Sequence, residues 1–421
     1  MVYIFAQTNK QTNKSKMKKV LLVFLLFNFT SIAFGQEVVN NSFGNGFYNV
    51  IAADSSYSMK FAARMQSLYI ADWSVDESNG LHNGNSQFLI RRARLKFGGF
   101  VLNPKVKYKI ELGLSNKDLG KVDARNNEAP KMILDAVVKW NFYKNFTLWV
   151  GQTKLPGNRE RVISSANLQL VDRSLVNKRF NIDRDMGMQI RHHFTLGNNF
   201  IVQESLAMSQ GEGRNVVQDN LGGYQWTGRL EVLPFGKFSG KGDYTGGALK
   251  REKTPKLAVG VTYDRNNSVK DRSNLGSYML IDGGEDEDIY YQTNINTVFI
   301  DAMFKYQSLS LMVEYASRDA ADPIAKNSDG TQTGDVVQVG NGLNIMTGYI
   351  LENNIEITGR YTSIKLDKNI TGEDLETQYT LGLSKYFKGH KLKIQSDISY
   401  LTIDNNPTGN LLYRLQFDVH F

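Results

Sequence analysis

Residues 57–69 read YSMKFAARMQSLY, in which apolar or aromatic side chains alternate with polar or small ones. A side-chain period of two is typical of a β-strand. From Tyr57 to Tyr69 such a strand spans about 40 Å, at about 3.3 Å per residue. Tilted by about 40°, it covers about 30 Å, which is the thickness of the hydrocarbon core of a bilayer. The length and the tyrosine at each end predict a strand of a transmembrane β-barrel.

The same alternation recurs along the chain after residue 56. It predicts an all-β fold, a 16-stranded antiparallel transmembrane β-barrel, whose even number of strands is the rule in bacterial barrels. The predicted strands are residues 57–70, 87–98, 105–115, 132–142, 145–153, 186–194, 199–209, 224–233, 256–264, 295–306, 309–318, 343–351, 354–363, 377–387, 391–402 and 410–421.

The connections between these strands alternate in length, which supports the strand assignment independently. If the first strand runs outward from the periplasm, every second connection should be a short periplasmic turn. Short turns fall at residues 103–104, 143–144, 197–198, 307–308, 353–354 and 388–389. Long extracellular loops fall at residues 71–86, 116–131, 154–185, 265–294, 319–342 and 364–376. One connection breaks the rule, because residues 234–255 form a long segment on the short side.

The N-terminus carries an export signal. Residues 17–27 read MKKVLLVFLLF, and Ala33-Phe34-Gly35 is a small-x-small cleavage signal before Gln36. The apolar run is shorter than the roughly 20 residues of a membrane-spanning helix. We therefore predict an upstream extension and a cleaved signal peptide over residues 1–35, with the signal starting at Met17. Residues 36–56 would form an N-terminal periplasmic segment, and residues 57–421 the barrel.

The charge balance gives no reason to expect a nucleic-acid partner. The chain has 50 Lys and Arg against 42 Asp and Glu, and removal of the leader takes away five lysines and no acid. The 45 remaining bases nearly match the 42 acids. The sequence has no cysteine, so it can form neither a disulfide nor a lipid anchor through cysteine. It has no GxSxG or HExxH pattern, and we expect no catalytic site, metal site or cofactor.

The last strand ends on an aromatic residue, Phe421. A closed barrel needs its last strand to pair with its first, because an open strand edge in lipid is very costly. A terminal strand with an aromatic last residue is typical of the signal that outer-membrane assembly machinery reads. We therefore expect Phe421 to recruit this machinery, and truncation here to abolish assembly.

Several motifs resemble those of the phosphate-selective porins O and P, in the form common among Bacteroidetes-like bacteria. They are FLIRRARL at residues 88–95, LDAVV at 134–138, GQTKLP at 151–156, RDMGMQ at 184–189 and the terminal Phe421. The resemblance covers nearly the whole mature chain. It implies a 16-stranded, trimeric barrel in the bacterial outer membrane, with a long third loop folded into the lumen.

In such a barrel the working residues lie on the inward polar face and on the third loop. The candidate pore-lining residues are Lys60, Arg64, Arg92, Arg94, Lys96, Lys105, Lys107, Lys109, Lys154, Arg159, Arg161 and Arg184. Later strands bring acids inward: Asp135, Glu231, Asp301, Glu314, Glu356, Asp397 and Asp418. We predict a lumen with bases on one side and acids on the other. The alternative is a general polar lumen in which the bases pair with the acids.

The favoured function is a passive diffusion channel for small hydrophilic solutes with a preference for anions, phosphate among them. Two alternatives remain: a non-conducting structural or adhesive outer-membrane barrel, and an outer-membrane hydrolase. Barrels of sixteen strands usually hold water in the lumen, which favours the channel. The expected partners are outer-membrane lipid and lipopolysaccharide, the barrel-assembly machinery, small anionic solutes and two further copies of the chain.

Overall fold

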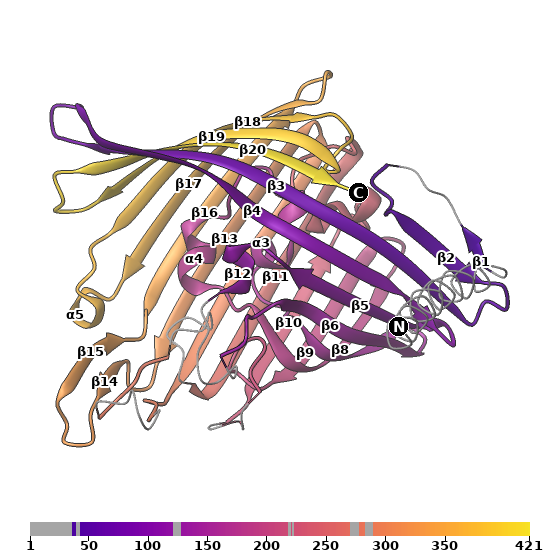
Figure 1. Ribbon diagram of the computed structural model, residues 1–421, viewed down its shortest axis with the longest axis horizontal. Helices are drawn as coiled ribbons and strands as arrows, with labels where there is room; N and C mark the ends of the chain where they lie inside the picture. The colour runs from indigo at the N-terminus through magenta and orange to yellow at the C-terminus, as the bar shows by residue number, and fades with distance from the viewer. Residues whose placement is uncertain are drawn as a thin grey trace, which may run out of the picture.

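The alternating segments form sixteen antiparallel strands that close into a barrel (Figure 1). Each strand pairs with its neighbours in chain order, and the last pairs with the first along its whole length. The all-β, 16-stranded fold that the sequence predicts is confirmed. The strands are β3 (Tyr57–Val75), β4 (Leu81–Val101), β5 (Asn103–Gly113), β6 (Ile133–Tyr143), β7 (Phe146–Lys154), β8 (Arg184–Leu196), β9 (Phe200–Ser209), β10 (Gln225–Leu233), β11 (Glu252–Val269), β12 (Thr293–Gln307), β13 (Leu309–Ala320), β16 (Gly340–Ile350), β17 (Ile355–Leu366), β18 (Glu376–Tyr386), β19 (Leu392–Ile403) and β20 (Gly409–His420).

The computed structural model describes residues 36–38, 43–120, 128–217, 220, 223–269, 278–282 and 289–421. The predicted upstream extension and signal peptide, residues 1–35, lie outside the described residues. Within the described part of the chain, no helix has both the length and the apolar composition needed to cross a membrane.

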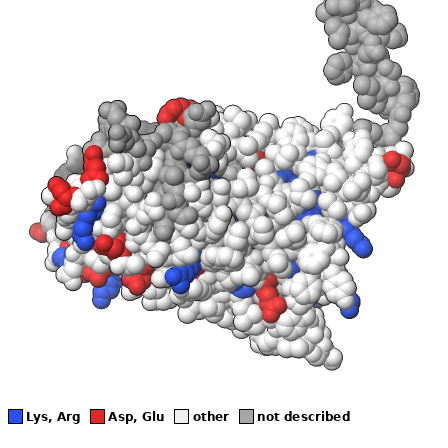
Figure 2. All heavy atoms as spheres, turned by 90° about the horizontal axis from the view of Figure 1, so that it is seen from below, with Lys and Arg blue, Asp and Glu red and all other residues white. Residues whose placement is uncertain are grey.

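Each barrel strand turns successive side chains alternately outward and inward. On β18, Tyr379, Leu381 and Leu383 are more than half exposed on the outside, whereas the alternating residues Gln378 and Thr380 are buried inside. Figure 2 shows that uncharged side chains cover most of one face of the molecule. An apolar outer surface around a polar interior is the arrangement of a barrel that sits in lipid.

Short turns and long loops lie at opposite ends of the barrel, as predicted, but the loop predicted at residues 71–86 is mostly strand, because β3 continues to Val75 and β4 begins at Leu81. Except for residues 234–251, the short turns contain one to five residues. The other end, which we call the long-loop end, carries the small elements α2 (Asn116–Leu119), β14 (Ile324–Lys326), β15 (Gln332–Val336) and α5 (Lys368–Thr371). β14 and β15 pair with each other in a separate hairpin.

Two further strands extend the sheet at the short-turn end. β1 (Gln36–Val38) pairs with β2 (Tyr48–Ala52), and β2 pairs with β3, so that Tyr48 lies opposite Phe61. β20 ends at its pairing with Arg64, only three residues further along β3. β2 therefore continues along the edge of β3 that β20 leaves open.

The third loop, residues 155–183, folds into the lumen (Figure 1). It carries α3 (Arg159–Val162), η2 (Ser165–Asn167) and α4 (Leu175–Phe180), and α4 packs against β13, β16 and β17. Its apolar residues Val176, Phe180 and Ile182 are fully buried in a cluster with Phe299 and Ile364 of the wall. Burial of side chains of this size stabilises by about 1.5–3 kcal/mol each, which holds the loop inside.

A second insertion enters the lumen from the short-turn end. It comprises residues 234–251 between β10 and β11 and includes η3 (Ser239–Tyr244). Its Phe238 is buried with Leu168 and Leu170 of the third loop and with Leu233 and Met303 of the wall. The connection whose length the sequence left unexplained is therefore part of the interior packing.

Candidate pore lining

A basic cavity of about 420 Å³ lies where the third loop meets β4, β6 and β8. It is lined from three directions, by the barrel wall, by the third loop and by the loops before β6 and β10. Among the described residues, the lining includes three carboxylates, Asp118, Asp183 and Glu212, and ten bases: Arg91, Arg92, Arg94, Lys117, Lys131, Lys154, Arg161, Arg173, Arg184 and Arg214. Bases therefore outnumber acids in what we call the basic cavity.

Three arginines reach the basic cavity from β4 because of a β-bulge. Residues 66 and 67 of β3 lie opposite residues 92 and 90 of β4, which leaves Arg91 as an extra residue. The side chain of Arg91 donates a hydrogen bond to Asp172 of the third loop at 2.7 Å. Arg91, Arg92 and Arg94 thus all face the lumen, although strict alternation turns Arg91 toward the lipid.

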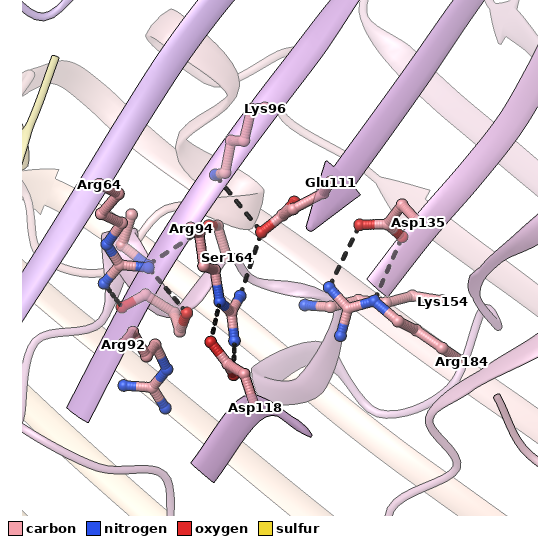
Figure 3. A network of polar contacts seen from close by, with 12 residues as sticks. Arg64, Arg92, Arg94, Lys96, Glu111, Asp118, Asp135, Lys154, Ser164 and Arg184 are labelled. Atoms are coloured by element: carbon pink, nitrogen blue, oxygen red, sulfur yellow. Dashed lines mark hydrogen bonds and ion pairs between the residues drawn. The ribbon is translucent and has the colours of Figure 1, made fainter. Parts of the chain in front are cut away.

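The charge of Arg94 is matched by two acids (Figure 3). Its guanidinium donates to both carboxylate oxygens of Asp118, at 2.8 and 2.5 Å, and to Glu111 at 3.1 Å. Glu111 also lies 3.7 Å from Lys96 and 2.8 Å from Lys109. A bidentate contact fixes the guanidinium plane, so Arg94 is held in one orientation.

Arg184 and Arg161 are also paired with acids. Arg184 begins β8 and lies 3.2 Å from Asp135 of β6 and 3.6 Å from Asp183 (Figure 3 draws Arg184 and Asp135). Asp183 forms a further ion pair with Arg161. Burial opposes the ionisation of Asp183, yet the charges of Arg161 and Arg184 hold its pKa well below its usual value.

Two cations of the basic cavity are held by carbonyl oxygens instead. Nζ of Lys154 donates to the carbonyl oxygens of residues 161, 162 and 163, at 2.5, 3.3 and 3.2 Å. The guanidinium of Arg173 donates to the carbonyl oxygens of residues 160 and 163, at 2.8 and 2.7 Å. Neither cation forms an ion pair with a carboxylate of the described residues. Burial and then the charge of Arg161 lower the pKa of Arg173 to about 9, so Arg173 stays charged at neutral pH.

Arg64 fastens the third loop to the closure of the barrel. Its guanidinium donates to the two carboxylate oxygens of Asp418 on β20, at 3.1 and 3.0 Å. It also donates to the hydroxyl and the carbonyl of Ser165, at 2.8 and 2.9 Å. Because Ser165 also lines the basic cavity, Arg64 holds one residue of the cavity wall in place.

An enclosed charge cluster lies on another side of the third loop. Arg159 donates to Glu231 of β10 at 2.6 Å, to Asp301 of β12 at 2.8 Å and to the carbonyl oxygen of Asp243 at 2.8 Å. Arg229 lies 2.7 Å from each of the same two carboxylates. The side chain of Arg159 is 0% exposed. The cluster therefore ties the loop to the wall and is almost entirely buried.

The second insertion supports the third loop from the short-turn end. The N–H of Gly246 donates to the carbonyl oxygen of Asn167 at 2.7 Å. Nζ of Lys305 donates to the carbonyl oxygens of residues 245 and 247 at 2.6 and 2.5 Å, and Nε2 of His390 lies 3.0 Å from the carbonyl oxygen of Gly246. The two insertions thus meet inside the barrel.

The insertions divide the lumen wall into two parts. Inward side chains on β10–β20 are buried against them, among them Asp301, Glu314 and Glu356. Several inward side chains on β4–β9 remain partly or fully exposed, although Arg92, Glu111, Asp135 and Gln189 of the same strands are buried. The exposed ones include Arg94, Lys96, Lys107, Lys109, Lys139, Trp149, Arg191 and Gln203. We call β4–β9 the open wall and β10–β20 the packed wall.

A family model described as phosphate-selective porin O and P matches residues 63–417. The chain belongs to this family. The match runs from the first barrel strand to the last and includes both insertions. The porin is located in the bacterial outer membrane, so its short turns face the periplasm. An uncharacterized protein of Aquifex aeolicus (strain VF5) is 24% identical over 374 residues, which cover 82% of this chain and 84% of that protein.

Solved porin structures share the fold at low sequence identity. A loop L8 deletion mutant of OmpT from Vibrio cholerae has a TM-score of 0.54 at 11% identity and covers 86% of this chain and 99% of that chain. An anion-selective porin from Comamonas acidovorans has a TM-score of 0.50 at 11% identity and covers 87% of this chain and 100% of that chain. At these identities the likeness shows the fold alone.

The twelve predicted lining residues lie in five different settings. Five line the basic cavity: Arg92, Arg94, Lys154, Arg161 and Arg184. Arg64, Lys96 and Lys109 belong to the ion pairs just below it, and Lys105 and Lys107 are exposed further toward the periplasm. Lys60 lines a separate groove beside β2, and Arg159 lies in the enclosed cluster.

Sequence reasoning missed several lumen-facing bases of the porin. Arg91 was excluded by strict alternation, because the bulge leaves no mark in the pattern. Lys139 and Arg191 lie on β6 and β8, and their inward position follows from the same alternation that identified the earlier bases. Arg214 lies in a loop, whose position alternation does not predict. Among the described residues, no group of three or more His, Asp or Glu side chains could hold a metal ion.

Proposed function

We propose that this porin is a passive diffusion channel that favours small anions of the size and charge of phosphate, and that it is not an enzyme. The observation that carries the proposal is Arg173, a guanidinium held by carbonyl oxygens in the basic cavity, with the Lys154 amine beside it on carbonyl oxygens of the same loop. Cations without a carboxylate leave a positive potential in a narrow passage with low-dielectric walls.

The other arginines of the basic cavity suit passage rather than permanent binding. A guanidinium can donate two parallel hydrogen bonds to an oxyanion. Arg94 and Arg184 are already engaged by acids, which limits how tightly they hold a passing solute. A channel must bind its solute strongly enough to admit it and weakly enough to release it.

The experiment is conductance of the full chain in a planar lipid bilayer, with the reversal potential measured across a KCl gradient. We expect open channels with a chloride preference. The double variant Lys154→Gln, Arg173→Gln should lower the chloride-to-potassium permeability ratio roughly threefold, which corresponds to about 0.7 kcal/mol of lost attraction.

The matched control is Lys326→Gln, on the β14–β15 hairpin at the long-loop end, where the side chain is 43% exposed. It removes a positive charge outside the lumen and should leave the ratio unchanged. Wild-type channels without ion preference, or a double variant with the wild-type ratio, would contradict the proposal. Block of the chloride current by low phosphate concentrations would identify phosphate as a solute, and absence of block would leave a general anion porin.

The second candidate is a closed structural or adhesive barrel. The observation that favours it is the contact between the two insertions at Asn167 and Gly246, together with the burial of the packed wall. The same bilayer measurement separates the two candidates. Channels of any selectivity would exclude the closed barrel, and repeated failure of correctly folded protein to conduct would support it.

We further propose a homotrimer embedded in outer-membrane lipid and lipopolysaccharide. Support comes from OmpT of Vibrio cholerae, which has been solved in a trimer form and has a TM-score of 0.50 to this chain. Crosslinking in native outer membranes should trap a species of three chains. A monomer as the largest crosslinked species would contradict the trimer.

The ends of the chain carry two further proposals. The mature protein begins at Gln36, after export through a signal peptide that starts at Met17, and residues 36–56 face the periplasm. Phe421 is the residue that the barrel-assembly machinery reads. Sequencing of the mature N-terminus tests the first, and the outer-membrane yield of Phe421→Ala tests the second. An N-terminus within the barrel, or an unchanged yield, would contradict them.

A further inference from the structure

A tryptophan with two cations lies on the open wall, below the third loop. Trp149 of β7 faces the lumen between Lys139 of β6 and Arg191 of β8. Nζ of Lys139 lies 3.5 Å from the centre of the indole ring, and Cζ of Arg191 lies 4.1 Å from it. Both distances are those of cation–π contacts, so the ring holds both charges in place.

The two cations have no acid of their own. Among the described residues, Lys139 and Arg191 form no ion pair with a carboxylate, and the hydrogen bonds of the Arg191 guanidinium go to the amide oxygen of Gln189, at 2.8 and 3.2 Å. The acids on the flanking strands are engaged elsewhere. Asp135 binds Lys109 and Arg184, and Glu231 binds Arg159 and Arg229. The pair therefore presents two positive charges to the lumen.

Arg191 also lines a cavity of about 300 Å³ on the periplasmic side. Its lining includes the uncharged hydrogen-bonding side chains of Asn141, Asn145, Thr147, His193, Gln203 and Ser205, together with Lys144 and the pair of His192 and Glu204. Lys139 and Trp149 lie outside this lining, so Arg191 is the residue that joins them to the cavity. Gln203 and Ser205 reach up to a small space of about 50 Å³ under Pro156 and Val162 of the third loop. The cavity thus lies on the open wall, between the third loop and the periplasm.

We propose that Lys139, Trp149 and Arg191 form a binding site for a small organic anion that carries several hydroxyl groups, such as a sugar acid or a sugar phosphate. The two cations match the single anionic group, and the amides and hydroxyls of the cavity match the hydroxyls of the solute. The indole fixes the positions of the two cations through its ring faces. Inorganic phosphate has the charge but not the hydroxyl chain. This site rests on the proposed anion channel and names a solute class for it.

The experiment is block of the single-channel chloride current by gluconate, a hydroxylated carboxylate, compared with propionate, a carboxylate without hydroxyls. We expect gluconate to block at a lower concentration than propionate. Trp149→Ala should raise the half-blocking gluconate concentration about tenfold, and Lys139→Gln several-fold, and both changes should also weaken block by propionate, whose carboxylate meets the same cations. Glucose 6-phosphate then distinguishes a phosphate group from a carboxylate as the anionic end.

Trp140→Ala is the matched control. Trp140 directly follows Lys139 on β6, faces the lipid and is 49% exposed. It should leave both half-blocking concentrations unchanged. Equal block by gluconate and propionate would overturn this site. Wild-type gluconate block in folded, conducting Trp149→Ala and Lys139→Gln channels would overturn it as well. In both cases the chloride preference of the wild type would still support the proposed channel. Loss of chloride preference in the wild type would instead overturn the proposed function.

Discussion

The open wall and the packed wall are built by the same alternation of inward and outward side chains, yet one faces open space and the other is buried under the insertions. On β12 and β17 the inward side chains include charged ones beside apolar ones, and Asp301 and Glu356 are buried because the third loop and the second insertion cover them. On β5 and β8 similar inward side chains, such as Lys107 and Arg191, remain accessible to solvent. The comparison teaches that alternation decides which face points inward, whereas the insertions decide whether that face is a pore or a core.

The difference extends to charge. Arg159 on the packed side has two carboxylates at hydrogen-bond distance and is fully enclosed. Lys139 and Arg191 on the open side have none among the described residues. Substitutions on the packed wall should therefore act on stability, and substitutions on the open wall should act on selectivity.

The largest effect is expected for Arg159→Met. The change leaves Glu231 and Asp301 buried with one cation fewer, and breaking a buried ion pair in this way costs about 3–5 kcal/mol. The measurement is the urea midpoint of the refolded barrel, followed by the shift in mobility of unheated protein on gels. Lys107→Gln on the open wall is the control and should keep the wild-type midpoint. Equal urea midpoints for Arg159→Met and Lys107→Gln would contradict the expected difference in stability between the packed wall and the open wall.

Phe180→Ala tests whether the third loop is fixed by apolar packing. Phe180 is 0% exposed among Val176, Phe299 and Ile364, and removal of such a ring costs about 3–5 kcal/mol. Because the barrel hydrogen bonds remain, the loop should loosen before the barrel unfolds, and single-channel conductance should become larger and noisier. Phe417→Ala, at a lipid-facing position with 50% exposure, is the control. A quiet channel of wild-type conductance would show that polar contacts suffice to hold the loop.

Charge reversal on the open wall should change selectivity without changing stability. Lys107→Glu replaces an exposed lumen-facing base, so the reversal potential should move toward the potassium value. The free energy of unfolding should change by about 0.5 kcal/mol or less, as for other exposed substitutions. Lys365→Glu, exposed on β17 near the long-loop end, serves as the control for charge outside the pore. An equal shift in both variants would place Lys107 outside the conducting path.

The smallest effect concerns pH. Burial opposes the ionisation of Asp172, yet Arg91 and then Arg414 hold the pKa of this carboxyl well below its ordinary value of 3.8. A lowered pKa in the folded state stabilises fully above the ordinary value and is lost only as pH falls through the lowered value. The third loop should therefore keep its contact with β4 and β20 from pH 7 to pH 4, with constant conductance. Asp172→Asn lacks this ion pair at every pH and serves as the control. A change in the conductance of the wild type between pH 5 and 6 would contradict the expectation.

Much of the fold could be predicted from the sequence, because membrane strands must be long, paired and apolar on one side. The strands, the closure by the last strand and the inward third loop were predicted in this way or through the family resemblance. The path of residues 234–251 was not, because alternation describes wall residues and Phe238 finds its partners only in the folded lumen. The inward position of Arg91 was not predicted for a related reason. The bulge adds one residue to β4 and so changes which side chains point inward.

The lining residues were harder to predict than the walls. Arg159 and Arg161 are two positions apart in the same loop, yet one is enclosed and the other lines the basic cavity. Their sequence context does not separate them, because the difference depends on which acids the folded loop approaches. Inward position can therefore be predicted for strand residues, whereas accessibility cannot.

The end of the chain is covered by its beginning. The N–H of Phe421 donates to the carbonyl oxygen of Ala63 at 2.9 Å, and the Phe421 ring stacks on Phe47 at 4.8 Å with Phe43 at its edge. β2 follows directly along the same edge of β3. These contacts partly cover Phe421 once the barrel has closed. If the assembly machinery reads Phe421, as proposed above, docking of residues 43–52 would make that signal less accessible in the closed barrel than in a barrel that is still being assembled.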